Sequence, residues 1–122
     1  MAECWIDLLE SPLQAGDPLL LSCSVCLPSD CSLESLTATL CSLIHQSFRN
    51  VEVILPPEPW PLGFDLELWR ERCRSLRGLH INGLSRMPSH YQFVITAGIV
   101  LEPDELLALE WRLRRQLEQR HQ

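Results

Sequence analysis

The sequence predicts an α/β fold, in which about three helices pack on a mostly parallel, four-stranded sheet to make three layers. Two apolar runs of strand length, residues 19–27 and 51–55, are nearly continuous, as in strands buried on both faces. A helical pattern separates the two runs, and Pro28-Ser29 supplies a turn after the first. This order is that of a β-α-β unit, which opens nucleotide-binding types of fold.

The first helix is predicted over residues 33–46, because apolar residues recur there at helical spacing. Ser32 or Asp30 would cap its N-terminus. The second strand, residues 51–55, follows within a few residues. The apolar stripe of the helix consists of Leu33, Leu36, Leu40, Leu43 and Ile44.

A proline-rich loop separates this unit from the next helix. Residues 56–63 read PPEPWPLG, and their four prolines predict a rigid surface loop. A second helix is expected over residues 65–76, with acidic residues early, arginines late and Gly78 after its end. A short third strand is expected over residues 79–84.

The last two elements are a strand over residues 91–101 and a helix from Pro103 to about Arg120. Only about six residues separate the third and fourth strands, whereas a parallel crossover usually needs about a dozen. Two arrangements stay open: a taut loop that makes a parallel crossing, which we favour, or an antiparallel pair. The inward stripe of the last helix would be Leu106, Leu109, Leu113 and Leu117.

Length and composition indicate one globular domain. Residues 19–122 are assigned to this domain and residues 1–18 to a lead-in segment. The net charge of −6 argues against binding to nucleic acid or to an anionic membrane. A signal-peptide pattern and a membrane-spanning apolar stretch are both missing, so we expect a cytoplasmic protein whose six cysteines are reduced.

Several short segments match a known pattern. Residues 24–29 read SVCLPS, residues 45–48 read HQSF, and residues 50–55 read NVEVIL. Later, YQFVI at residues 91–95 precedes LEPDEL at residues 101–106. In this order the segments resemble the N-terminal half of family-2 glycosyltransferases. The resemblance implies a Rossmann-like half of the GT-A fold over most of residues 19–110.

The chain departs from this family where the family does its chemistry. The family holds a divalent cation with an Asp-x-Asp motif after the fourth strand, where this sequence has Thr96, Ala97 and Gly98. A hard cation needs carboxylate oxygens, which these residues lack. The family's general base and acceptor site come from a C-terminal half that has no counterpart here. We therefore expect no catalytic residue, no metal and no cofactor.

A nucleotide site is one open alternative. Pro28, Ser29 and Asp30 lie where the first strand meets its helix, the usual ligand crevice of an open α/β sheet. Ser29 and nearby backbone amides could hold a phosphate. Glu58 is the acid nearest the family's nucleoside-contacting position. We favour the simpler explanation, in which Ser29, Asp30 and Ser32 only cap the helix.

The cysteines support a structural role better than a chemical one. Cys23 and Cys26 lie three residues apart on a strand, so their thiols point to opposite faces and do not suit one zinc ion. Buried thiols in the core are the favoured interpretation. Cys31 at a helix start is the candidate for a nucleophile, a minority alternative with His45, His80 or His90 as its possible base.

Two tryptophans are candidate partner-binding residues. Trp60 stands in the proline loop and Trp5 in the lead-in segment, and an aromatic side chain on a stiff loop loses little entropy on docking. Trp60 could equally fold back over the second helix. The favoured function is a non-catalytic glycosyltransferase-like domain, a pseudoenzyme, that binds a protein partner or a second copy of itself. The alternative is a minimal or partner-dependent glycosyltransferase that binds a nucleotide-sugar.

Overall fold

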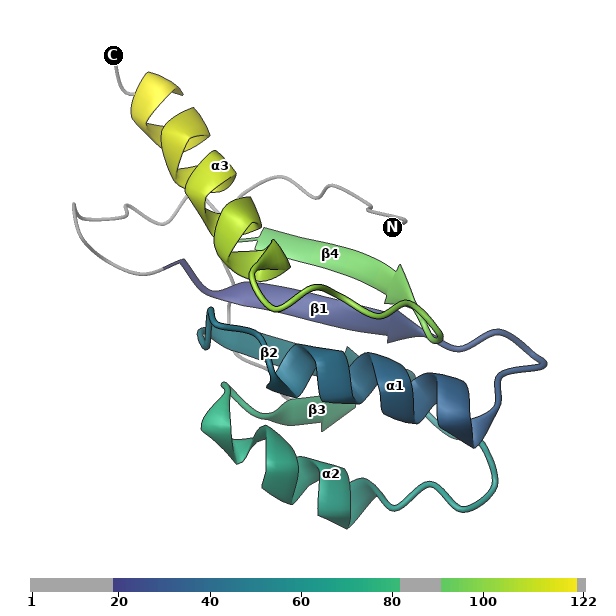
Figure 1. Cartoon of the computed structure of the whole chain (residues 1–122). Coiled ribbons are helices and arrows are strands. Elements are labelled where there is room, and N and C mark those ends of the chain that lie inside the picture. Colours follow the sequence, from purple (N-terminus) through teal and green to yellow (C-terminus); the bar gives the residue numbers. More distant parts are fainter. Residues whose placement is uncertain (1–18, 82–90, 121–122) are drawn as a thin grey trace.

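Residues 19–81 and 91–120 are described by a computed structural model, with the backbone alone for residues 117–120. They form four strands, three α-helices and one 3-10 turn (Figure 1). In chain order these are β1 Leu21–Cys26, α1 Leu33–Ile44, β2 Val51–Leu55, α2 Leu66–Arg72, the 3-10 turn Cys73–Ser75, β3 Leu79–Ile81, β4 Tyr91–Thr96 and α3 Glu105–Arg120.

The four strands form one sheet in the order β3-β2-β1-β4, and every neighbouring pair is parallel. Leu21 of β1 is in register with Val51 of β2 on one side and with Tyr91 of β4 on the other. The predicted β-α-β unit and parallel sheet are therefore confirmed. The antiparallel alternative for β3 and β4 is wrong, because these two strands lie at opposite edges of the sheet. The crossing itself, residues 82–90, lies outside the described residues.

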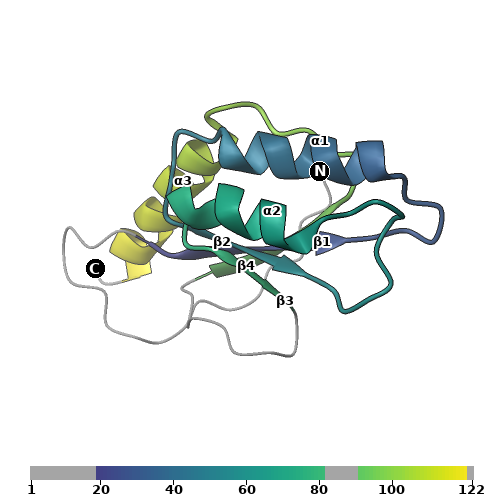
Figure 2. The same ribbon diagram turned by 90° about the horizontal axis from the view of Figure 1, so that it is seen from below.

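All three α-helices lie on the same face of the sheet (Figure 2). The two β-α-β units move along the sheet in the same direction, from β1 to β2 to β3. Because such crossovers have one preferred hand, α1 and α2 fall on one face. The described elements thus make two layers, and the third layer that we expected has no helix among the described residues. In the same part of the chain, no helix is both long and apolar enough to cross a membrane.

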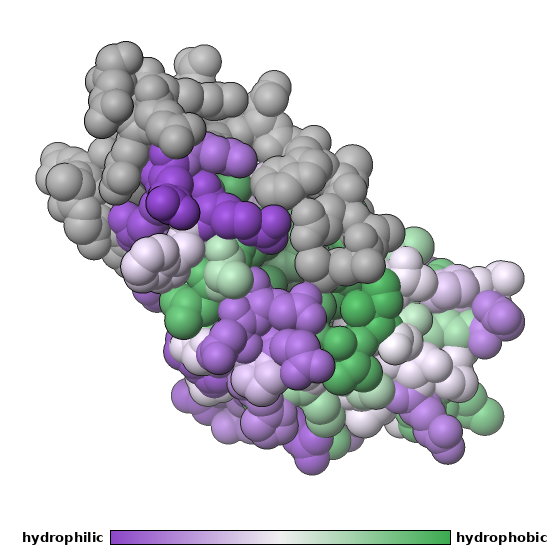
Figure 3. Space-filling view, turned by 45° about the horizontal axis from the view of Figure 1, so that its top comes forward, coloured by the Kyte–Doolittle hydropathy of each residue, from purple (hydrophilic) through white to green (hydrophobic). Residues whose placement is uncertain are grey.

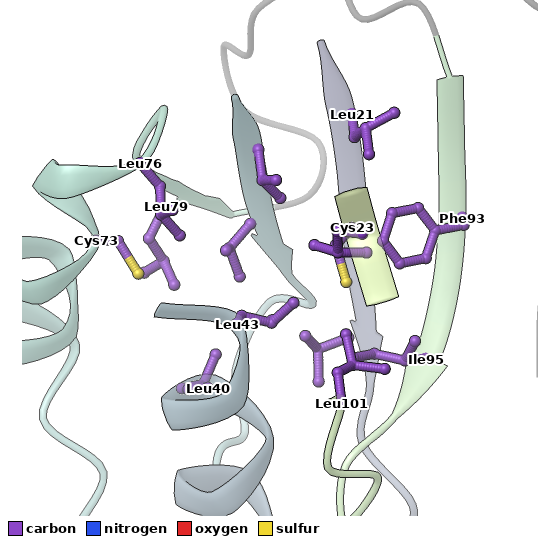
Figure 4. Close-up of a cluster of buried hydrophobic side chains, with 14 of the residues drawn as sticks. Leu21, Cys23, Leu40, Leu43, Cys73, Leu76, Leu79, Phe93, Ile95 and Leu101 are labelled. Atoms are coloured by element: carbon purple, nitrogen blue, oxygen red, sulfur yellow. The ribbon is translucent and has the colours of Figure 1, made fainter. Parts of the chain in front are cut away.

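The core fills the space between the sheet and the helices. Cys23 of β1 and Phe93 of β4 point into it and are fully buried, as are Leu40 and Leu43 of α1. In Figure 4, the two α1 leucines lie between the side chains around β3 and those of β1 and β4. The predicted inward stripe of α3 is confirmed for Leu106, Leu109 and Leu113, and the side chain of Leu117 is outside the described part.

Several element boundaries differ from the prediction, each for a local reason. β4 ends at Thr96 instead of residue 101, because Gly98 has a positive φ of +106° and Ile99 N–H donates to the Thr96 carbonyl in a turn. α3 begins at Glu105 instead of Pro103. Its first i to i−4 bond runs from Ala108 to Asp104, so Pro103 precedes the helix.

Candidate functional site

The carboxyl ends of β1 and β4 mark the candidate site. From β1 the chain continues through α1 to β2 on one side, while β4 is added on the other side of β1. The sheet order therefore reverses between β1 and β4, and open α/β sheets bind ligands outside the carboxyl ends of strands at such a point. Cys26 and Thr96 are in register at this edge. Residues 27–31 and 97–98 follow directly.

The loop after β1 presents Pro28, Ser29 and Asp30 to solvent. A turn closes it, since Cys31 N–H donates to the Pro28 carbonyl over 2.9 Å. The cap of α1 is Ser32, whose hydroxyl accepts a hydrogen bond from Ser35 N–H at 3.1 Å. Of the two N-caps that the sequence allowed, Ser32 is therefore the one used. Ser29 and Asp30 lie beside the helix start with exposed side chains.

Two hydrogen bonds join the turn after β4 to α1. This turn is the place at which family-2 glycosyltransferases carry their metal ligands. The Thr39 hydroxyl donates to the Ile99 carbonyl at 2.8 Å and accepts from Gly98 N–H at 2.8 Å. Ala97 N–H donates to the Cys26 carbonyl at 2.9 Å. This part of the edge thus offers a hydroxyl, a methyl group and backbone groups that already have partners. A hard cation finds no carboxylate ligand in it.

Glu58 is exposed in the loop after β2. That loop and the loop after β1 leave the same end of the sheet (Figure 1). The structure therefore places Glu58 at the same edge as Ser29 and Asp30, as parallel neighbouring strands require. Among residues 19–81 and 91–120, no group of three or more His, Cys, Asp or Glu side chains is arranged to hold a metal ion.

Trp60 is half-buried and packs back on the domain. Its indole Nε1 donates to the Pro56 carbonyl at 2.9 Å. Its ring meets Phe64 edge-on, with 5.5 Å between the ring centroids, and both rings pack against the core. The position agrees with the alternative in which Trp60 folds inward. Trp5, the other candidate for partner binding, lies outside the described residues.

The strand cysteines point to opposite faces, as the spacing predicted. Cys23 is fully buried, and Cys26 is exposed. Burial raises the pKa of the Cys23 thiol, and it raises the pKa of Cys73 to about 11. The pKa of Cys31 is also raised, by partial burial and by the neighbouring Asp30. A raised thiol pKa lowers the thiolate fraction at neutral pH, so Cys31 is poorly suited to act as a nucleophile.

Because burial raises the pKa of the Cys73 thiol, we expect the protein to lose stability at alkaline pH. The Cys73 thiol ionises near 9 when unperturbed and at about 11 in the folded protein, so the folded state holds its proton more tightly. The stabilisation is complete below pH 9 and declines as the pH rises toward 11. We expect urea unfolding of Cys73→Ala to show a shallower alkaline decline than the wild type. If the free energy of unfolding declined equally with pH in the two proteins, the raised pKa of the Cys73 thiol would be contradicted.

A buried polar cluster on the other face of the sheet was missed. Glu52 of β2 is fully buried and accepts a hydrogen bond from the Ser22 hydroxyl at 3.0 Å. Its second oxygen lies 3.6 Å from His80 Nε2. The sequence carried one signal, a glutamate inside the apolar strand VEVIL, since a buried carboxylate normally needs partners.

The outer face of α3 was also missed. Leu107 and Trp111 lie one turn apart and are 36% and 65% exposed. The sequence signal was a tryptophan away from the inward leucine stripe of this helix. A large exposed aromatic side chain beside an exposed leucine is typical of a binding surface.

Comparisons of the chain with protein-family models, with curated proteins and with solved structures give no match.

Proposed function

We propose that this chain is a non-catalytic, glycosyltransferase-like domain that works as a protein interaction module. The observation that carries the proposal is the exposed apolar surface of α3. We call this surface the α3 face and define it by Asp104, Leu107, Ala108, Trp111 and Arg115. All five side chains are exposed, while the leucines on the other side of the helix are buried.

The α3 face has the composition of a docking surface. Trp111 can bury a large area on binding and has few rotatable bonds to immobilise, which is why tryptophan dominates many interfaces. Leu107 widens the apolar centre by one helical turn, and charged side chains flank it. Figure 3 shows one side of the molecule, where hydrophobic surface (green) lies directly beside hydrophilic surface (purple).

The candidate nucleotide edge supports the non-catalytic proposal as well. In metal-dependent glycosyl transfer the sugar moves from a nucleotide-sugar to an acceptor, and a cation neutralises the diphosphate that leaves. The turn at Thr96–Gly98 has no carboxylate, and Thr39 binds the Gly98 N–H in it and the Ile99 carbonyl that follows it. Ser29, Asp30 and Glu58 remain as polar side chains at the edge, and they carry the alternative function, a nucleotide-sugar transferase.

An affinity capture with matched variants tests the proposal. The full chain is used as bait in three forms: wild type, Leu107→Asp and Leu62→Asp. Leu62 lies on the loop after β2 and is 98% exposed, so the same chemical change is made there at a site away from the α3 face. We expect a bound protein, whether its own chain or another, to be retained by wild type and Leu62→Asp and lost from Leu107→Asp. Identical captures by all three would contradict the proposal.

Calorimetry distinguishes the proposed function from the alternative, a nucleotide-sugar transferase. Titration with UDP- and GDP-sugars in the presence of Mn²⁺ is expected to give no binding heat. Metal-dependent binding that disappears in Asp30→Ala or Glu58→Ala would support the transferase instead.

A further inference from the structure

We infer that the occupant of the α3 face is the α3 face of a second copy of this chain, packed antiparallel about a two-fold axis. This inference rests on the proposed function and names its partner. The starting point is the distribution of charge along the helix. Asp104 directly precedes the helix and accepts a hydrogen bond from the Ser47 hydroxyl at 2.6 Å, Arg115 lies near the helix end, and both side chains are exposed.

Helix geometry places the five residues of the α3 face together. Successive residues turn by about 100°, so positions 104, 107, 108, 111 and 115 fall within an arc of about 100°. The buried leucines lie on the other side of α3 and are used by the core. The ion pair between Glu110 and Arg114 is outside this arc, and Glu110 is buried. The face therefore has an acidic end, an apolar centre and a basic end.

An antiparallel pairing brings opposite charges together. A two-fold axis midway between Ala108 and Trp111 sets Asp104 against Arg115 of the second copy, and symmetry repeats the pair. Each charge then lies about 8 Å along the helix from the axis, given a rise of about 1.5 Å per residue. A parallel pairing would instead set each aspartate against its own equivalent, which is repulsive. The charges thus select the antiparallel arrangement.

The apolar centre is complementary in size under the same symmetry. Trp111 of each copy is set against Ala108 of the other, so the largest side chain on the face meets the smallest. A small residue opposite a large one lets two helices approach closely. The five residues of the face carry one acid and one base, and Arg112, exposed beside them, comes opposite Leu107 of the second copy, where its aliphatic stem can pack on the leucine.

Sedimentation equilibrium of the purified full chain tests the inference. We expect a monomer–dimer equilibrium in the micromolar range that weakens as salt is raised. Leu107→Asp should raise the dimer dissociation constant about tenfold or more, while Leu62→Asp should leave it unchanged. Circular dichroism checks that each variant is folded. A wild type that stays monomeric at several hundred micromolar, or equal constants for the two variants, would overturn the inference.

A charge exchange tests the orientation. Arg115→Glu should weaken the dimer, and the double variant Asp104→Arg/Arg115→Glu should restore it, because the exchanged charges again face each other. Failure to restore it in a folded double variant would overturn the antiparallel pairing. If the pure chain is monomeric but capture still depends on Leu107, the second copy is ruled out while the proposed function stands. If capture also ignores Leu107, both fail.

Discussion

Replacing Gln46 by methionine is expected to lower the free energy of unfolding by about 3 kcal/mol, because the change leaves the Leu106 N–H without its partner and removes two further hydrogen bonds. Gln46 follows α1 and is 1% exposed. Its amide Nε2 donates to the Ser42 carbonyl at 3.2 Å and to the Glu102 carbonyl at 2.6 Å. Its Oε1 accepts from Leu106 N–H at 3.0 Å.

These contacts make Gln46 the joint between α1 and α3. Leu106 lies in the first turn of α3, where backbone N–H groups have no partner within the helix. Methionine has nearly the same volume but neither donates nor accepts in this geometry, so the Leu106 N–H loses its bond and the Glu102 carbonyl keeps only the bond from Glu105 N–H. The measurement is urea denaturation followed by circular dichroism, with the free energy extrapolated to water.

The same substitution at an exposed site serves as the control. Gln116 of α3 is exposed, so Gln116→Met makes an identical chemical change away from the joint. We expect this variant to differ from wild type by less than about 0.5 kcal/mol. Similar losses of unfolding free energy in Gln46→Met and Gln116→Met would show that the contacts of Gln46 do not stabilise the packing of α1 against α3.

Thr39→Val is expected to cost about 2 kcal/mol, again by breaking two hydrogen bonds with little change in volume. The Thr39 hydroxyl holds the turn after β4 through Gly98 and Ile99. Valine keeps the shape of threonine and removes the hydroxyl, so the variant isolates the polar contacts. The free energy of unfolding, measured in urea, gives the effect directly.

Thr37→Val is the matched control for this helix. Thr37 stands two residues earlier on α1 and is half-buried. The same change there should alter the free energy of unfolding by less than about 0.5 kcal/mol. If Thr37→Val destabilised the protein as much as Thr39→Val, the loss could not be assigned to the two hydrogen bonds of Thr39, since Thr and Val differ little in helix propensity and the two changes share only the lost hydroxyl and methyl exchange. The hydrogen bonds between Thr39 and the turn after β4 would then contribute little to the free energy of unfolding.

Local sequence patterns predicted most of the elements correctly. The stripe Leu36–Leu40–Leu43 with Ser32 before it specified α1, and the run VEVIL specified β2 with the observed bounds. Such signals act between residues at most four apart, through periodicity, capping and turn chemistry. They also explain where prediction failed by a few residues, as at the end of β4, where the turn depends on Gly98.

The candidate site was predictable in part. The position of Ser29 and Asp30 after a buried strand was enough to place them at the carboxyl edge. The inward position of Trp60 could not be chosen from the sequence, because it depends on a ring contact with Phe64 and a bond to the Pro56 carbonyl. The exposure of Trp111 depended on which side of α3 the core used.

The sequence by itself therefore determined that this protein is built from parallel β-α units, and that the residues after the fourth strand, Thr96 to Gly98, include no carboxylate. Only the tertiary structure decided the strand order β3-β2-β1-β4, the single helical face and the two ties from α1 to the segment after β4. Those ties join Thr39 to Ile99 and Gln46 to Leu106, residues sixty positions apart. No local pattern specifies such a contact, because it forms only when the packed sheet brings distant segments together.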